Sequence, residues 1–307
     1  MKRIIPIILL VLCVFAFTGC KKNSVNTKYK IVATNFPCYD FARAVIKDVD
    51  DISVKMLIKP GSETHDFEPT PQDIIDITNA DFFIYVGGES DEWVDRVLKD
   101  NNISEDKTIR MMDFVNLKQE ELKEGMSGED EGEYDEHIWT SPINAIRIIE
   151  AIRDRLVAKN PAKLDAYTDN TQKYVAQLQN IDQEIRTIVQ NSKRKELIFA
   201  DRFPFRYFVD EYGLDYYAAF PGCSDQTESS SSTVAFLIDK VKTDNIPVVL
   251  KIELTSDALA KTISNETGAK ILTLSAGHNI SQADFNAGKT YASILTENIT
   301  VLGEALN

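Results

Sequence analysis

The chain has 307 residues, of which 43% are hydrophobic and 27% are charged, and its formal net charge is -14 at pH 7. This length has room for two ordinary domains, and the composition allows a large core without disulfide staples. An acidic surface disfavours nucleic acid and anionic membrane surfaces as partners and weakly favours cations.

The first nineteen residues have the form of a secretory signal peptide. Lys2 and Arg3 precede an apolar run at 4–17 that is shorter than the roughly 20 residues of a membrane span. The residues Phe17-Thr18-Gly19-Cys20 that follow resemble a bacterial lipobox, in which the cysteine is lipidated; the alternative is an ordinary signal peptide that contains a cysteine. We expect a signal peptide at 1–19, a lipid on Cys20 and a polar tether at 20–27, which together place the protein outside the cytoplasm, anchored to the bacterial cell membrane.

Strand and helix patterns alternate in the next part of the chain. Alternating or short apolar runs predict strands at 30–34, 52–58 and 81–86, and helical spacing predicts helices at 38–45, 71–79 and 92–98. Strands that alternate with helices indicate a parallel sheet covered by helices on both faces. Ligands bind such sheets beyond the carboxyl ends of the strands.

The segment 119–136 breaks this pattern. Nine of its residues are acidic and three are glycines. Dense like charge with glycine does not build a core, so the sequence predicts a mobile loop. Two interpretations of it stay open, a solvated insertion and a loop that collects cations weakly.

A long helix is predicted after Pro161, which suits the first turn of a helix. Apolar residues recur every three or four positions from Leu164 to Ile188, and neither proline nor glycine interrupts 162–191. About 30 residues give a rod of roughly 45 Å, enough to run along two stacked domains.

The second half repeats the alternation of strands and helices. The patterns predict strands at 196–200, 216–220, 248–252 and 270–274, and helices at 205–212, 233–243, 258–267 and 291–306. The expected organisation is an N-terminal α/β domain at 28–142 that carries the acidic loop 119–136, a linking region with the long helix at 143–192, and a C-terminal α/β domain at 193–307.

The chain has only three histidines, and all of them fall in predicted loops. His65 and His278 directly follow predicted strands, where a parallel sheet presents its ligand site, and His137 follows the acidic segment. Neutral imidazole is the commonest metal ligand in proteins. Spacing alone leaves metal binding and scattered surface histidines both open, because the sequence lacks short-range pairs such as HExxH or CxxC.

Two cysteines belong to the mature chain besides Cys20. Cys13 leaves with the signal peptide, and Cys38 and Cys223 remain. Outside the cytoplasm a disulfide between them is permitted. A metal ligand and two buried thiols are the other possibilities.

Several short motifs resemble those of a known family. They are Thr34-Asn35-Phe36-Pro37, the segment from Pro60 to Pro69 around His65, Ala80-Asp81, His137-Ile138-Trp139-Thr140-Ser141-Pro142, and Asn160-Pro161. Over about residues 28–306 the chain resembles the zinc- and manganese-binding receptors of ABC importers, the helical-backbone metal receptor group among the cluster A-I solute-binding proteins. The resemblance implies two parallel-sheet (β/α) domains joined by one long backbone helix, with a metal site in the cleft between them.

The resemblance also implies ligands, and the chain departs from the family at two of them. His65 and His137 match the histidines of the first two loops. The third histidine and a carboxylate are expected in the second domain, where this chain has Arg202, which cannot ligate a cation, and Ser275. His278 is the natural substitute, with Cys223 or Glu253 in the fourth place. Structural roles remain open for these residues: Cys223 as a turn thiol, Glu253 as a hydrogen-bond acceptor, and Arg202 as a partner for a carboxylate such as Asp201.

These expectations describe a non-catalytic, monomeric binding protein of an ABC importer that captures a divalent transition metal and delivers it to the permease. Zinc is the expected ion because the ligands are rich in imidazole, whereas manganese prefers more oxygen. The alternatives are a manganese or metal-chelate receptor, an extracellular metallohydrolase, and a surface adhesin.

Overall fold

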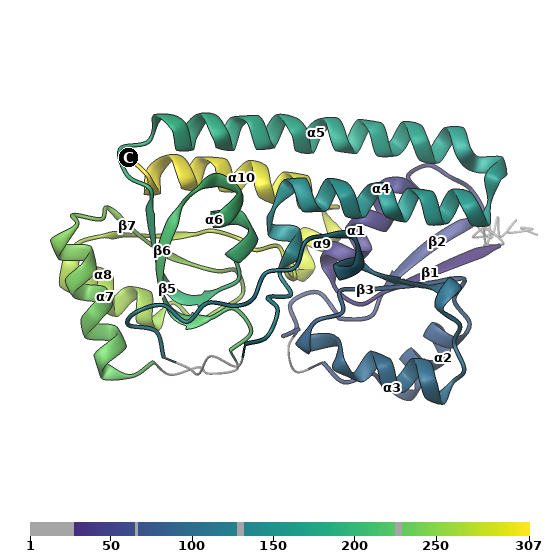
Figure 1. Cartoon of the computed structure of the whole chain (residues 1–307), viewed down its shortest axis with the longest axis horizontal. Helices are drawn as coiled ribbons and strands as arrows, with labels where there is room; N and C mark the ends of the chain where they lie inside the picture. The colour runs from purple at the N-terminus through teal and green to yellow at the C-terminus, as the bar shows by residue number, and fades with distance from the viewer. Residues whose placement is uncertain (1–27, 65–66, 128–131, 225–228) are drawn as a thin grey trace, which may run out of the picture.

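The computed structural model describes residues 28–64, 67–127, 132–224 and 229–307. Two four-stranded sheets lie side by side, and a single long helix runs along both of them (Figure 1). This arrangement confirms the expected fold of two parallel-sheet halves joined by a backbone helix.

The first sheet has the strand order β2-β1-β3-β4, and all of its pairings are parallel. Its central strand β3 is buried on both faces, because Phe82 and Ile84 join one apolar cluster while Phe83 and Tyr85 join another. The strands are β1 (Tyr29–Ala33), β2 (Ile52–Met56), β3 (Phe82–Tyr85) and β4 (Thr108–Arg110), and the helices are α1 (Phe36–Val45), α2 (Pro71–Thr78) and α3 (Glu92–Asp100). The three expected strands and three expected helices are all present, and β4, with three residues, is too short to show a pattern.

The second sheet repeats the topology with the order β6-β5-β7-β8, again fully parallel. On one face, Ile198 of β5 packs with Leu237 of α7 and Ile263 of α8, and on the other face Phe199 packs with α10. The strands are β5 (Glu196–Phe203), β6 (Asp215–Pro221), β7 (Val248–Lys251) and β8 (Lys270–Thr273). The helices are α6 (Arg206–Tyr212), α7 (Ser231–Thr243), α8 (Ala258–Thr267), α9 (Gln282–Asn286) and α10 (Tyr291–Ala305), of which only the short α9 was not expected.

The long helix α5 spans Leu164–Asn191, and Pro161 opens the short 3-10 turn that leads into it. Its 28 residues give a length of about 42 Å. The helix α4 (Pro142–Lys159) packs beside it over the first sheet, and α10 packs beside it over the second (Figure 1). A single apolar cluster includes residues of all three helices and of both sheets, so the two halves share a core on this side.

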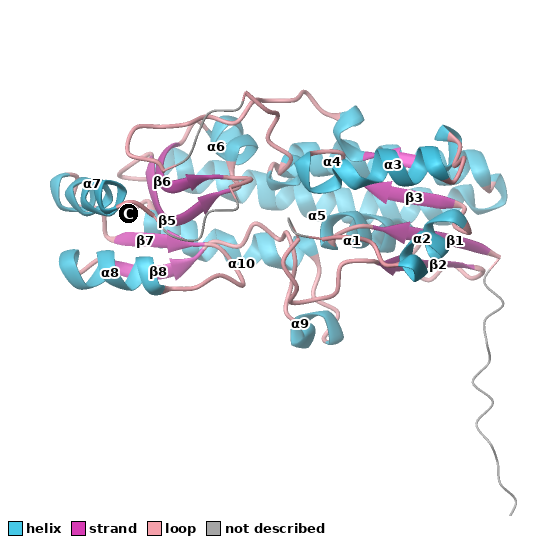
Figure 2. Cartoon of the chain, turned by 90° about the horizontal axis from the view of Figure 1, so that it is seen from below, coloured by secondary structure: helices cyan, strands magenta, loops and turns pink. Residues whose placement is uncertain are grey.

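The strands of the two sheets point toward each other, so their carboxyl ends meet near the centre of the molecule (Figure 2). The loops that follow these strands therefore lie together, where parallel sheets place their ligand sites. Within the described residues, no helix is both long enough and apolar enough to span a membrane.

Candidate metal centre

His137 is completely buried at the start of a 3-10 turn, Ile138–Thr140, that leads into α4. The carboxylate of Asp135 accepts a hydrogen bond from the His137 backbone N–H at 2.7 Å and lies 3.0 Å from Nδ1 of the ring. Nδ1 therefore carries the proton when the ring is neutral, and the lone pair is on Nε2. Burial by itself lowers the pKa of His137, but the carboxylates of Asp135, Glu136 and Glu120 outweigh it and raise the pKa overall.

Glu136 is a buried carboxylate beside His137 that the sequence analysis counted only as part of the acidic segment. Its Oε2 accepts a hydrogen bond from the backbone N–H of Ser90 at 2.9 Å, and its Oε1 accepts one from Ser90 Oγ at 2.5 Å. Gly88 permits this placement, since a Cβ there would lie 2.3 Å from Cβ of Glu136. The signal for Glu136 in the sequence was its position directly before His137.

Cys223 lies just beyond the carboxyl end of β6. Its backbone N–H donates to Glu120 Oε1 at 2.9 Å. Ligand atoms of Glu136, His137 and Cys223 lie within 4.8 Å of one another, close enough to hold one metal ion after a small adjustment. Burial raises the pKa of the Cys223 thiol, and the carboxylates of Glu136, Asp135 and Glu120 raise it further. Cys38 is also a free thiol, but it is buried in the core of the first half.

His278 approaches the same point from the loop after β8. Its ring centroid lies 5.0 Å from that of His137, and its Nε2 lies 3.9 Å from Glu136 Oε1. The indole of Trp139 packs 5.1 Å away and donates a hydrogen bond to the carbonyl oxygen of Ala276. The loop bends at Gly277, whose φ of 68° favours glycine. The structure thus brings Glu136, His137 and Cys223 within 4.8 Å of one another and places His278 beside His137 and Glu136, although His278, like Glu253, lies outside that three-residue cluster of the described residues.

Glu253 has a different position from the other candidates. Its two carboxylate oxygens accept hydrogen bonds from the backbone N–H groups of Ala276 at 2.7 Å and His278 at 2.9 Å. It lies outside the three-residue cluster found among the described residues, and burial raises its pKa. Glu253 therefore supports the loop that carries His278, in the hydrogen-bonding role left open above.

Arg202 pairs with a carboxylate of the other half rather than with Asp201. Its Nη2 lies 3.2 Å from Glu63 Oε2, and its Nη1 lies 3.4 Å from the carbonyl oxygen of Ser224. Asp201 accepts hydrogen bonds from the Ile252 N–H and the Thr255 hydroxyl instead. Arg202 thus has the role of a carboxylate's partner that was left open above, with Glu63 in place of Asp201 because its side chain extends across to the first half.

Two predicted residues, His65 and Cys20, lie outside the described part of the chain. Thr64, directly before His65, is described, and its Oγ1 lies 3.1 Å from Nε2 of His278. The side-chain amide of Asn279 donates to the carbonyl oxygens of Lys59 and Ser62 at 2.9 and 2.8 Å. The loop that leads to His65 is thus hydrogen-bonded to the loop that carries His278.

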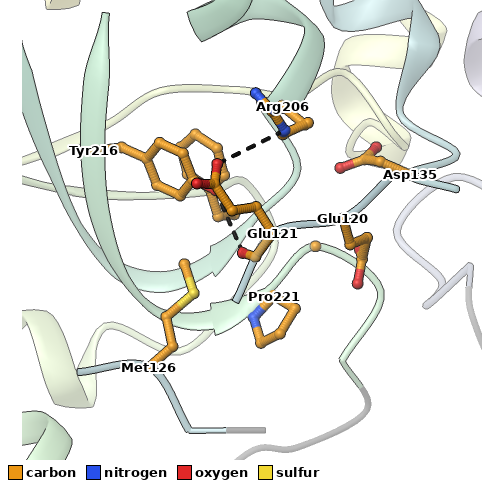
Figure 3. Close-up of a pocket in the computed structure, with 9 residues that line it drawn as sticks. Glu120, Glu121, Met126, Asp135, Arg206, Tyr216 and Pro221 are labelled. Carbon is orange, nitrogen blue, oxygen red and sulfur yellow. Dashed lines mark hydrogen bonds and ion pairs between the residues drawn. The ribbon is translucent and has the colours of Figure 1, made fainter. Parts of the chain in front are cut away.

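Residues 118–127, which include the start of the acidic segment, lie against the second half of the molecule. We call them the acidic strap. Its Ser127 N–H donates to the Ala219 carbonyl oxygen at 2.9 Å, and Tyr216 Oη lies 3.5 Å from the Glu121 carbonyl oxygen. Figure 3 shows Glu120, Glu121 and Met126 of the strap around a crevice at the ends of β5 and β6, with Asp135 and Arg206. Met126 and Glu120 of the strap make contacts that the charge count does not reveal, and the predicted mobility of the segment stays a prediction.

Imidazole, thiolate and carboxylate donors together suit a tetrahedral ion such as zinc. The carboxylates of Glu136 and Asp135 add negative charge at a buried position, which favours a cation there.

Comparison with known proteins agrees with this chemistry. The family model of zinc-uptake complex component A, periplasmic (ZnuA), matches residues 31–305. The zinc-binding lipoprotein AdcA of Streptococcus pneumoniae strain R6 is 32% identical over 308 residues, which cover 98% of this chain and 60% of that protein. The high-affinity zinc uptake system protein ZnuA of Bacillus subtilis strain 168 is 30% identical over 310 residues, which cover 97% of this chain and 94% of that protein.

Solved structures give the same result. The crystal structure of the Zn(II)-bound ZnuA-like domain of S. pneumoniae AdcA matches with a TM-score of 0.76 and 31% identity, covering 91% of this chain and 99% of that one. The chain thus spans about 60% of the length of the streptococcal AdcA proteins and matches their ZnuA-like domain.

Proposed function

Because the chain belongs to the family of the periplasmic zinc-uptake complex component A, we propose that it is the extracytoplasmic metal receptor of an ABC importer. It captures a zinc ion between its two halves and delivers the ion to the permease. The observation that carries this proposal is the approach of His278 to Glu136 and His137, which come from opposite halves of the molecule.

The proposed ligands are His65, His137 and His278, with Glu136 as the carboxylate from the same turn as His137. The rings of His137 and His278 are nearly perpendicular, with an interplanar angle of 84°, and a buried carboxylate lies beside both. Two or three imidazoles with one carboxylate favour zinc over manganese, which prefers oxygen donors. Glu253 is proposed to support the site by holding the His278 loop, without contact to the ion.

A receptor fits this site better than a hydrolase does. The carboxylates near the histidines are engaged in fixed hydrogen bonds, Asp135 with His137 and Glu136 with Ser90, which suits holding an ion in place. The family is that of an uptake component, which also supports capture and delivery.

Elemental analysis and metal titration of the purified chain test the proposal. We expect one zinc per chain, and each of the variants His65→Ala, His137→Ala and His278→Ala should weaken zinc binding by roughly 100-fold or more, since each removes a proposed ligand. Glu266→Ala, on the outer helix α8, is the matched control and should bind like the unchanged chain. Tight zinc binding by His278→Ala would refute its assignment, and equal affinity for manganese would favour the manganese receptor.

The membrane anchor is proposed from the sequence of the leader. Lipidation of Cys20 would hold the receptor at the outer surface of the cell membrane, beside a permease, as a monomer on a short tether. Membrane fractionation of Cys20→Ser tests this, because loss of the lipid site should release the protein or block its processing. Unchanged membrane attachment would contradict the anchor but not the metal site.

A further inference from the structure

We propose that Cys223 is a thiolate ligand of the transported ion, and that its sulfur makes the centre selective for zinc and other thiophilic ions over manganese. The inference rests on the proposed function, since it concerns the same metal centre. It adds a donor that is neither imidazole nor carboxylate.

Polar side chains lie at or just beyond the carboxyl end of each strand of the second sheet. They include Arg202 of β5, Cys223 after β6, Glu253 after β7 and His278 after β8. Arg202 pairs with Glu63, and Glu253 accepts hydrogen bonds from two backbone N–H groups. Cys223 and His278 are therefore the two that supply donors toward Glu136 and His137.

The backbone around Cys223 is held close to the ring of His137. A Cβ at Gly222 would lie 3.2 Å from His137 Nδ1 and 3.0 Å from the Phe203 carbonyl oxygen, so any larger residue would push this turn away. The Cys223 N–H is bonded to Glu120 of the acidic strap. A turn with these contacts on both sides places the sulfur reproducibly.

The distances suit a shared ion. With Cys223 the proposed donors number five, and zinc accepts five as well as the tetrahedral four. Bonds of about 2.3 Å to sulfur and about 2.0–2.1 Å to nitrogen put neighbouring donor atoms roughly 3.5 Å apart or less. The donors of Glu136, His137 and Cys223 lie within 4.8 Å of one another, so they need to close by about 1 Å around an ion.

The chemistry of sulfur favours zinc at this position. Thiolate is a soft donor that favours zinc and cadmium, whereas manganese favours oxygen. When the ion binds, a metal–sulfur bond forms and the thiol proton leaves to solvent, with no change of oxidation state.

Absorption spectroscopy with cobalt(II) and cadmium(II) as probes tests the inference on the purified chain under reducing conditions. A sulfur ligand gives a thiolate-to-metal charge-transfer band in the ultraviolet, which nitrogen and oxygen ligands do not give. We expect this band in the unchanged chain and in Cys38→Ala, whose thiol lies in the core. The band should be absent in Cys223→Ser and Cys223→Asp, although both should still bind cobalt.

Selectivity is the second measurement. The ratio of manganese to zinc dissociation constants should fall by at least roughly tenfold in Cys223→Asp, because an oxygen donor replaces sulfur. Cobalt binding without the band, or a band that survives in Cys223→Ser, overturns the thiolate ligand and leaves the receptor proposal in place. If the unchanged chain binds none of these ions, the receptor proposal itself fails, and the thiolate ligand fails with it.

Discussion

Arg202 and Glu63 form an ion pair that joins the two halves of the molecule, with 3.2 Å between Nη2 and Oε2. Glu63 belongs to the loop that leads to His65, and Arg202 lies at the end of β5. The backbone N–H of Gly61 donates to the carbonyl oxygen of Ile280 at 2.8 Å in the same region. The loop that leads to His65 and the loop that carries His278 are therefore hydrogen-bonded to each other directly, in addition to the shared core under α5.

Replacing Arg202 by methionine should speed the release of zinc by about two- to fivefold, the factor expected for loss of a partly exposed ion pair. The unfolding temperature should change little, because Glu63 is half exposed. Stopped-flow transfer of zinc to a chelator measures the rate. Lys261→Met, which breaks an exposed pair with Asp257 on α8, is the matched control. Slower release from Arg202→Met would indicate that the guanidinium acts mainly by repelling the metal ion.

Replacing Asp135 by asparagine should weaken zinc binding by about 10- to 100-fold, the usual cost of losing a carboxylate that orients a ligating histidine. The amide keeps a hydrogen bond to His137 but removes the negative charge that strengthens the imidazole as a donor. Isothermal titration with zinc measures the loss. Asp154→Asn, an exposed carboxylate on α4, serves as the control. Unchanged affinity in Asp135→Asn would show that the tautomer of His137 is set by other contacts.

Most elements of the fold could be predicted from local patterns. The apolar residues of α5 recur along one face over 28 residues, and the strands are short apolar runs between helices, so both show in the sequence. The positions of His137 and His278 at the ends of elements were also visible. The strand β4 and the helix α9 could not be recognised, because three and five residues are too few to show the periodic spacing of apolar residues.

The contacts within the centre depend on tertiary packing that local patterns do not encode. Glu136 looked like one more charge of an acidic run, but it is buried and its carboxylate accepts hydrogen bonds from Ser90. Arg202 and Glu63 lie 139 positions apart in the sequence, so their pairing could be known only once the two halves were placed relative to each other. The same holds for Glu120, whose contact with Cys223 gives an acidic loop residue a fixed structural role.

Replacing Glu120 by alanine should weaken zinc binding by about tenfold. The substitution leaves the partly buried N–H of Cys223 without its acceptor, and the loss of such a hydrogen bond costs about 1–1.5 kcal/mol. Competition with a zinc chelator measures the change. Glu124→Ala removes an exposed carboxylate of the same strap and should have little effect. Equal losses in the two variants would show that the strap acts only through its overall charge.

The metal-free protein should lose stability as the pH rises from about 4 to about 7, and Asp91 should be one cause. Asp91 is buried, and its Oδ2 accepts hydrogen bonds from the N–H groups of Val86 at 2.7 Å and Gly87 at 3.0 Å. Burial, with the nearby charge of Glu136, raises the pKa of Asp91 from its ordinary 3.8 to about 7. The folded state therefore binds the Asp91 proton more tightly than the unfolded state does, so this contribution is full below pH 4 and is lost by about pH 7.

At 1.36 kcal/mol per pKa unit, the raised pKa of Asp91 sets an upper limit of about 4 kcal/mol on its contribution to the free energy of unfolding. Asp91→Asn should make the free energy of unfolding depend less on pH, because the amide oxygen can accept both backbone hydrogen bonds and carries no charge to bury. Urea unfolding of the two proteins at several pH values between 4 and 8, in the presence of a chelator, measures the difference in the free energy of unfolding. Asp113→Asn, at an exposed position, should show the same pH dependence of the free energy of unfolding as the unchanged chain. The same slope in Asp91→Asn as in the unchanged chain would mean that another buried group binds the proton.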